Sequence, residues 1–90
     1  MFAVQIRPEI LSRLRQEYTP GTEVELVSMT DLYRDMQSGL RGVVDLVDDA
    51  GGIHINWSNG SGLAVLPGID DFRVLSTGRL LSDLLKEMRT

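Results

Sequence analysis

The feature that most constrains this chain is a short alternating segment held between two chain reversals near the middle of the sequence. From Ile53 to Trp57, large apolar residues alternate with polar ones, which is the period of a strand with one buried face. Residues 49–52 (DAGG) precede the segment and Asn59-Gly60 follows it, and glycine and asparagine reach positive φ at little cost. The stretch therefore predicts a central strand of a small antiparallel sheet with tight turns at both ends.

Other segments extend this sheet. The expected strands, in chain order, are residues 22–28, 43–47, 53–57, 62–66 and 71–75. The segment 29–40 has neither strand nor helix periodicity and is expected to be a long loop, and 67–70 is expected to be a single turn of helix or a tight bend. A long loop after the first strand, followed by tight hairpins, is typical of a small five-stranded SH3-like antiparallel barrel. The predicted fold is mainly β, with flanking helices.

Two amphipathic segments predict the helices. The first is expected at about residues 8–18, where Pro8 suits the first turn and apolar residues recur at helical spacing. The second is expected at about residues 77–89, with Thr77 as its N-cap. Its apolar positions form one dense stripe: Leu80, Leu81, Leu84, Leu85 and Met88. This stripe is expected to cover the barrel, to pack on the first helix, or to form a homodimer interface.

The chain length and composition indicate a single domain of 90 residues. Its expected parts are an N-terminal arm and helix at 1–20, the barrel at 21–75 and a helical extension at 76–90. The sequence contains no cysteine and shows no signal-peptide pattern, which favours a reducing, cytoplasmic setting. No stretch approaches the roughly 20 apolar residues of a membrane-spanning helix, so no membrane association is expected.

Charge is distributed unevenly along the chain. Residues 21–75 carry nine acidic and three basic residues, whereas each end has one excess positive charge. Surfaces that bind nucleic acid are basic, so nucleic acid is an unlikely partner of the central region. A nucleic-acid accessory role is kept as the alternative function. It would require the basic residues of the two helices to converge: Arg7, Arg13, Arg15, Arg79, Lys86 and Arg89.

The inventory of reactive side chains is small. His54 is the only histidine, and a catalytic dyad would have to join it to Ser58 or Ser61 without any recognisable nucleophile motif. The acidic pairs 48–49 and 70–71 lack the ligand spacing of a calcium loop and are expected to stabilise turns. The sequence thus predicts no catalytic residue, no metal and no cofactor, and the protein is not expected to be an enzyme.

The loop after the first strand offers a candidate partner-binding site. Asp31, Tyr33 and Arg34 lie in this loop, and a protruding Trp57 beside them would form an aromatic peptide groove. Trp57 also shares a face with Ile53, so a core position is the favoured alternative. Both interpretations stay open on the sequence alone.

Several motifs together resemble one known family. They are Leu14-Arg15-x-x-Tyr18-x-Pro20-Gly21-Thr22, Met29-x-Asp31-x-Tyr33, Gly42-x-Val44-x-x-Val47-Asp48-Asp49-x-Gly51, Ile53-His54-x-x-Trp57-x-Asn59-Gly60, and Pro67-Gly68-x-Asp70-x-Phe72. In this order and spacing they resemble a bacterial, phage and mobile-element family catalogued as domain of unknown function 4314, over roughly residues 10–74. The resemblance implies an SH3-like barrel and a phage or mobile-element context, and it implies no activity. The leading hypothesis is a non-catalytic interaction module that binds a protein or peptide.

Overall fold

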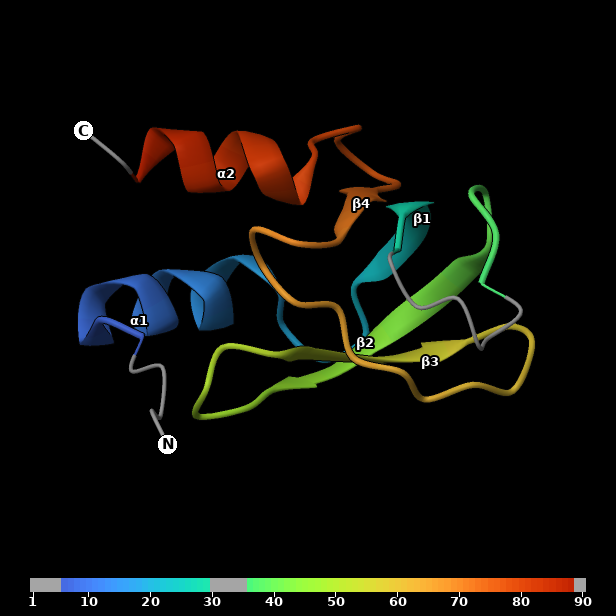
Figure 1. Ribbon diagram of the computed structural model, residues 1–90, viewed down its shortest axis with the longest axis horizontal. Coiled ribbons are helices and arrows are strands. Elements are labelled where there is room, and N and C mark those ends of the chain that lie inside the picture. Colours follow the sequence, from blue (N-terminus) through green and yellow to red (C-terminus); the bar gives the residue numbers. More distant parts are fainter. Residues whose placement is uncertain (1–5, 30–35, 89–90) are drawn as a thin grey trace.

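The computed structural model describes residues 6–29 and 36–88, which form two helices and one sheet (Figure 1). The elements, in chain order, are α1 (Pro8–Glu17), β1 (Glu23–Ser28), β2 (Arg41–Val47), β3 (Ile53–Trp57), β4 (Asp71–Val74) and α2 (Leu81–Glu87). All strand pairs are antiparallel, and the order across the sheet is β3-β2-β1-β4. The expectation of a mainly β fold with two flanking helices is confirmed.

The prediction of a five-stranded SH3-like barrel is wrong, because the strands of the described chain number four and form an open sheet. The expected fourth strand makes only an isolated bridge, in which Ile53 and Val65 exchange backbone hydrogen bonds of 2.9 and 2.8 Å. In the rest of this segment, side chains form the hydrogen bonds that a strand pairing would otherwise use. The Ser61 hydroxyl accepts the Leu63 N–H at 3.2 Å, and the Trp57 indole N–H donates to the Leu63 carbonyl at 2.9 Å.

One face of the sheet shares a hydrophobic core with both helices. The core residues, each at most 7% exposed, are Leu14, Tyr18, Val24, Leu26, Val44, Val47, Ile53, Ile55, Trp57, Val65, Phe72, Leu81 and Leu84. The rings of Tyr18 and Phe72 meet edge to face with centroids 5.0 Å apart, which ties the end of α1 to β4. Burial raises the pKa of the Tyr18 phenol, so this ring is neutral at physiological pH.

A glycine allows β2 and β3 to approach closely. Gly42 pairs with Trp57 across the two strands. A Cβ atom at this position would lie 2.6 Å from Ile55 Cγ2 and 2.8 Å from Trp57 Cε3. Both separations are well below the roughly 3.5–4.0 Å of a carbon–carbon contact. The two large side chains of β3 therefore fill the space that a side chain at position 42 would need.

The opposite face of the sheet is exposed and mixed in character. Val43 and Leu46 of β2 are 40% and 45% exposed, and the register with β3 shifts between Val44 and Leu46. Glu25 and Arg73 are cross-strand neighbours on β1 and β4, and their side chains form an ion pair of 3.7 Å. This face thus carries isolated aliphatic side chains among charged ones, which is ordinary for a solvated sheet surface.

The position of α1 agrees with the sequence prediction. The helix begins with Pro8, where the missing N–H has no helical partner to lose. It ends before Tyr18, whose backbone N–H donates to the Leu14 carbonyl at 2.9 Å. In the part of the chain that the structure covers, neither helix combines the length and apolar composition that crossing a membrane requires.

α2 begins later than predicted, at Leu81 rather than at Thr77. Gly78 has a φ of +73°, a left-handed conformation that interrupts a helix and that glycine adopts easily. The following residues run beside β4, where the Val74 N–H donates to the Arg79 carbonyl at 2.9 Å. The backbone groups before α2 are therefore used by the sheet edge, which delays the start of the helix.

Candidate functional site

The predicted peptide groove around Trp57 lies only partly within the described structure. Asp31, Tyr33 and Arg34 are outside the described residues. Trp57 is 3% exposed, and its indole N–H is bonded to the Leu63 carbonyl, so the ring belongs to the core. The alternative in which Trp57 protrudes toward a ligand is wrong for this reason, and the role of the three loop residues stays a prediction.

A shallow hollow of about 290 Å³ lies near the end of the same loop. It is lined by Gln37, Ser38, Leu40 and Asn59. Only one of these side chains is aliphatic, whereas peptide and small-molecule sites are lined predominantly by apolar groups. This hollow is therefore a poor candidate for a binding site.

The apolar stripe predicted for the C-terminal helix divides into two parts. Leu81 and Leu84 are fully buried and complete the core, so they cover the sheet within the same chain. Leu80 precedes the helix as its N-cap and is half-buried. Leu85 and Met88 are also half-buried and pack against the edge of the core. Leu85 and Met88 are consequently the members of the stripe at the end of the chain's last helix that a binding partner could still contact.

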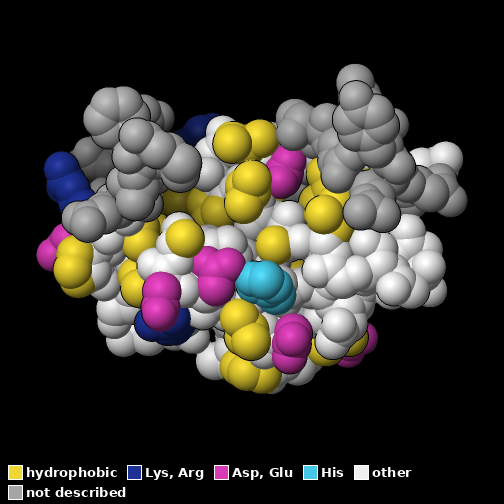
Figure 2. Space-filling view, turned by 60° about the horizontal axis from the view of Figure 1, so that its bottom comes forward, with side chains coloured by type: hydrophobic (Ala, Val, Ile, Leu, Met, Phe, Trp, Pro, Cys, Tyr) yellow, Lys and Arg dark blue, Asp and Glu magenta, His cyan; other side chains and the backbone are white. Residues whose placement is uncertain are grey.

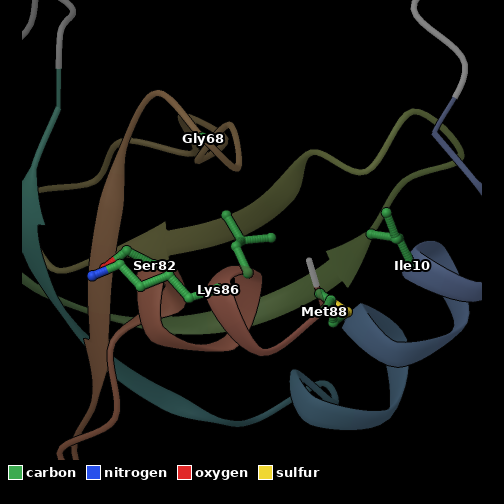
Figure 3. A pocket seen from close by; sticks show the side chains of 6 residues that line it. Ile10, Gly68, Ser82, Lys86 and Met88 are labelled. Atoms are coloured by element: carbon green, nitrogen blue, oxygen red, sulfur yellow. The ribbon is translucent and has the colours of Figure 1, made fainter. Parts of the chain in front are cut away.

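These two side chains line a groove between α1, α2 and the turn at 66–70, which we call the helix groove (Figure 3). The groove has a volume of about 450 Å³ and is lined by Ile10, Gly68, Ser82, Leu85, Lys86 and Met88. Figure 3 shows Ser82 and Lys86 at one end, Ile10 at the other and Met88 between them. Its volume falls within the roughly 300–1,000 Å³ of typical ligand pockets.

A second hollow of about 350 Å³ adjoins the helix groove. It shares Ile10 and Met88 with the groove and continues along α1, where its further lining residues are Glu9, Ser12, Arg13 and Gln16. On the other side, the turn around Gly68 carries Leu66 and Ile69, which are 47% and 59% exposed. Exposed aliphatic side chains thus lie on the same turn that forms one wall of the groove.

A pair of acidic residues holds two walls of the groove in place. Asp70 is 8% exposed, and its carboxylate accepts the Leu66 N–H at 3.0 Å, which closes the turn at 66–70. The Asp71 carboxylate accepts the Ser82 N–H at 3.0 Å and the Ser82 hydroxyl at 2.7 Å, which fixes the start of α2 to β4. Asp70 therefore has the turn-stabilising role expected from the sequence, whereas Asp71 positions α2 instead.

Ion pairs fix the two helices to each other. Arg13 bonds to Glu87 of α2 at 3.1 Å and to Glu17 of α1 at 3.3 Å. Arg79 bonds to the other oxygen of Glu87 and lies 3.9 Å from Glu17. Exposed pairs of this kind contribute little to stability, because water screens the charges. The network therefore sets the relative orientation of the helices more than it stabilises the fold.

Two charged residues at the groove are left out of this network. Lys86 lines one end of the helix groove, and Glu9 lines the adjoining hollow beyond Ile10. Within residues 6–29 and 36–88, neither Lys86 nor Glu9 forms an ion pair. The combined surface is therefore apolar in the middle, with an available cation on one side and an available anion on the other.

His54 takes part in a turn network. Its Nε2 lies 2.7 Å from Asp48 Oδ2, and Asp48 Oδ1 accepts the N–H groups of Ala50 and Gly52, each at 2.9 Å. Figure 2 shows this histidine at the surface among acidic side chains. The hydrogen bond to His54, helped by the two backbone bonds and opposed by burial, lowers the pKa of Asp48. Across the described residues, no three acidic or histidine side chains gather in a way that could hold a metal ion.

Replacement of Asp48 by asparagine is expected to lower the free energy of unfolding by about 1 kcal/mol at pH 7, because the amide oxygen is an uncharged and weaker acceptor for the Ala50 and Gly52 N–H groups, while partial exposure of the side chain screens the lost charge. The pKa of Asp48 is lower in the folded chain, so its carboxylate stabilises the fold above the unfolded value of about 3.9 and loses this effect as the pH falls through the folded value. The difference between wild type and variant should therefore shrink at acidic pH. Urea unfolding at pH 7 and pH 3 measures it.

The control for this experiment is Asp45→Asn, which changes an exposed carboxylate on β2. We expect the control to change stability by less than about 0.5 kcal/mol, as is usual for surface substitutions. A stability difference for Asp48→Asn that stayed the same at both pH values would contradict the assigned role of the carboxylate.

Sequence reasoning found only part of the groove. It singled out Leu85 and Met88, but it missed Ile10, Gly68 and Lys86 as neighbours of these residues. Ile10 belongs to an apolar stripe on α1, which is a usable signal for a packed or partner-binding face. The apolar stripes of α1 and α2 lie next to each other because of the way both helices pack on the sheet. This packing cannot be predicted from either stripe alone.

The fold and the groove define a small β domain with an apolar, helix-built surface. The chain belongs to the family described as "Domain of unknown function (DUF4314)", whose model matches residues 7–75. This match confirms the family resemblance seen in the motifs. No curated protein and no solved structure matches the chain. The matched region ends before α2, so the helix groove combines Ile10 and Gly68 from the family region with residues of α2 beyond it.

Proposed function

We propose that the chain is a non-catalytic interaction module that binds a protein or peptide segment in the helix groove. The observation that carries this proposal is an apolar groove in which Leu85 and Met88 are only half-buried beside Ile10. Amphipathic helices commonly bind by laying their apolar face into a groove of this kind. Lys86 and Glu9 supply opposite charges along the surface, which would fix the direction of a bound segment.

Other parts of the proposal rest on the sequence. The motif resemblance favours a phage or mobile-element context, and the lack of cysteine favours a cytoplasmic setting. The loop residues Asp31, Tyr33 and Arg34 are retained as a second candidate contact region. The non-catalytic character is supported by His54, whose ring nitrogen contacts the turn carboxylate of Asp48 rather than a serine hydroxyl.

A nucleic-acid accessory role is the alternative, and the pairing of the arginines weighs against it. Arg13 and Arg79 each lie near two carboxylates of the helices, and Arg15 bonds to Asp49 at 2.8 Å. A guanidinium that is already paired contributes less to the neutralisation of phosphates. Binding of a mixed oligonucleotide pool at low salt would favour this alternative over the proposal.

Site-specific photo-cross-linking tests the proposed function. Because the sequence contains no cysteine, one introduced cysteine carries the cross-linker at a single chosen position. Ser12→Cys places it in the hollow beside the helix groove. Ser58→Cys is the matched control, since Ser58 is also exposed and lies in the turn after β3, away from both helices (Figure 1).

We expect position 12 to form protein adducts in an extract of the native host, including adducts with another copy of the chain. Position 58 should form none. If position 12 formed no specific protein adduct, the groove would not be a protein-binding surface and the proposed function would be overturned.

A further inference from the structure

The surface around the helix groove is complementary to itself. We infer that the segment bound there is the same surface of a second copy of this chain, related by a two-fold axis. This inference rests on the proposed function, because it names the partner of the groove that the proposal assigns to protein binding.

The first argument is the order of residues along the surface. Lys86 lines the helix groove on one side, Glu9 lines the adjoining hollow on the other, and Ile10 and Met88 are shared by both. In a two-fold interface the same patch lies on both partners, so each end of the patch meets the opposite end of its copy. An axis near Met88 would bring Lys86 of each copy to Glu9 of the other.

The second argument is that, among the described residues that line the groove and its hollow, Lys86 and Glu9 are the charged ones outside the ion pairs. Arg13, Arg79 and Glu87 neighbour the groove and are engaged in the ion pairs between the helices. Lys86 and Glu9 form no ion pair within the described ranges. A purely acidic or purely basic partner segment would pair with one of them and repel the other, whereas a second copy pairs with both, so that the Lys86–Glu9 pair forms twice in the dimer.

The third argument concerns the centre of the surface. Met88 would meet its copy near the axis, and Ile10 and Leu85 would pack beside this contact, which removes half-buried apolar groups from water. The groove and its hollow are lined by only ten of the described residues, against the roughly 20–30 residues per partner of a standard interface. The association is therefore expected to be weak, with a dissociation constant between about 10 μM and about 1 mM.

Analytical ultracentrifugation of the full chain across this concentration range tests the inference. We expect the mass to rise toward that of a dimer for the wild type. Lys86→Glu and Glu9→Lys, which change exposed residues, should each weaken the dimer by about tenfold or more, because each sets like charges opposite one another. The double variant Glu9→Lys/Lys86→Glu restores both pairs in reversed order and should recover the wild-type dissociation constant.

Arg41→Glu is the control for the change in net charge, since Arg41 is exposed at the start of β2. It should leave the dimer unchanged. Far-UV circular dichroism of each variant shows whether the fold is retained. Recovery of the dimer in the double variant would show that the single variants lost an ion pair and not the structure of a helix.

A wild-type chain that stayed monomeric up to about 1 mM, the upper limit of the expected range, would overturn the inference. A dimer whose stability did not respond to the charge exchange would overturn it as well. In either case, adducts between position 12 and a different protein would leave the proposed function standing. If no dimer formed and position 12 gave no protein adduct, both the inference and the proposed function would be overturned.

Discussion

Replacement of Leu84 by alanine is expected to lower the free energy of unfolding by about 3 kcal/mol. Leu84 is 0% exposed and lies on α2 within the shared core, so the substitution leaves a cavity that the surrounding side chains only partly fill. Small domains are stable by only about 5–15 kcal/mol, so this loss is a large share of the total. Urea unfolding followed by the fluorescence of the buried, unique Trp57 measures it.

The matched control is Leu85→Ala, the same substitution at the next position of the same helix. Leu85 is half-buried at the groove, so its truncation is expected to cost about 1 kcal/mol. A small and equal effect at both positions would contradict the docking of α2 on the sheet. It would also contradict the division of the leucine stripe into a core part and a groove part.

The second large effect is expected at Gly42, where alanine should lower the free energy of unfolding by about 1–3 kcal/mol. The added methyl would lie 2.6 Å from Ile55 Cγ2 and 2.8 Å from Trp57 Cε3, and both neighbours are core side chains of the adjacent strand. They cannot retreat without repacking the centre of the protein. The same urea titration measures the change.

Gly62→Ala is the control for this prediction. A Cβ atom at Gly62 would have no neighbour within 4 Å, and the residue does not have a positive φ. Alanine there is expected to be neutral or to stabilise by up to about 1 kcal/mol, because it restricts the unfolded chain. Only the substitution at Gly42 should therefore destabilise the protein. A Gly42→Ala variant as stable as the wild type would show that β2 and β3 are not in the close register described.

The parts of the fold that follow from local periodicity could be predicted from the sequence. The alternation from Ile53 to Trp57 specifies a half-buried strand wherever that strand lies, and both the strand and its turns are present. The same is true of α1, because Pro8 and the residue before Pro20 limit it from both sides. Local backbone preferences and the tertiary structure agree at these positions.

Closure of the sheet could not be predicted, because it depends on a few specific hydrogen bonds. The indole N–H of Trp57 donates to the Leu63 carbonyl, and the Ser61 hydroxyl accepts the Leu63 N–H. Because both backbone groups of Leu63 are bonded to side chains, this segment does not form a full strand beside β3. The start of α2 depends in the same way on the left-handed conformation of Gly78. Neither the missing strand nor the late start of α2 can be predicted from a pattern of apolar and polar residues.

The candidate site shows the same limit. The density of leucines on the last helix predicts an apolar surface that is covered by another surface. The sheet of the same chain covers part of it. Leu81 and Leu84 are used within the chain, and Leu85 and Met88 are left at the groove. The assignment of each leucine follows from the angle at which Asp71 and the ion pairs hold α2, which no single segment encodes.

The proposal that the helix groove binds protein is tested most directly by the yield of cross-linked protein from position 12 relative to position 58. The proposal predicts specific protein adducts from Ser12→Cys in the extract, and none from Ser58→Cys at the far side of the sheet. Equal yields from the two positions, or no adduct from position 12, would contradict it.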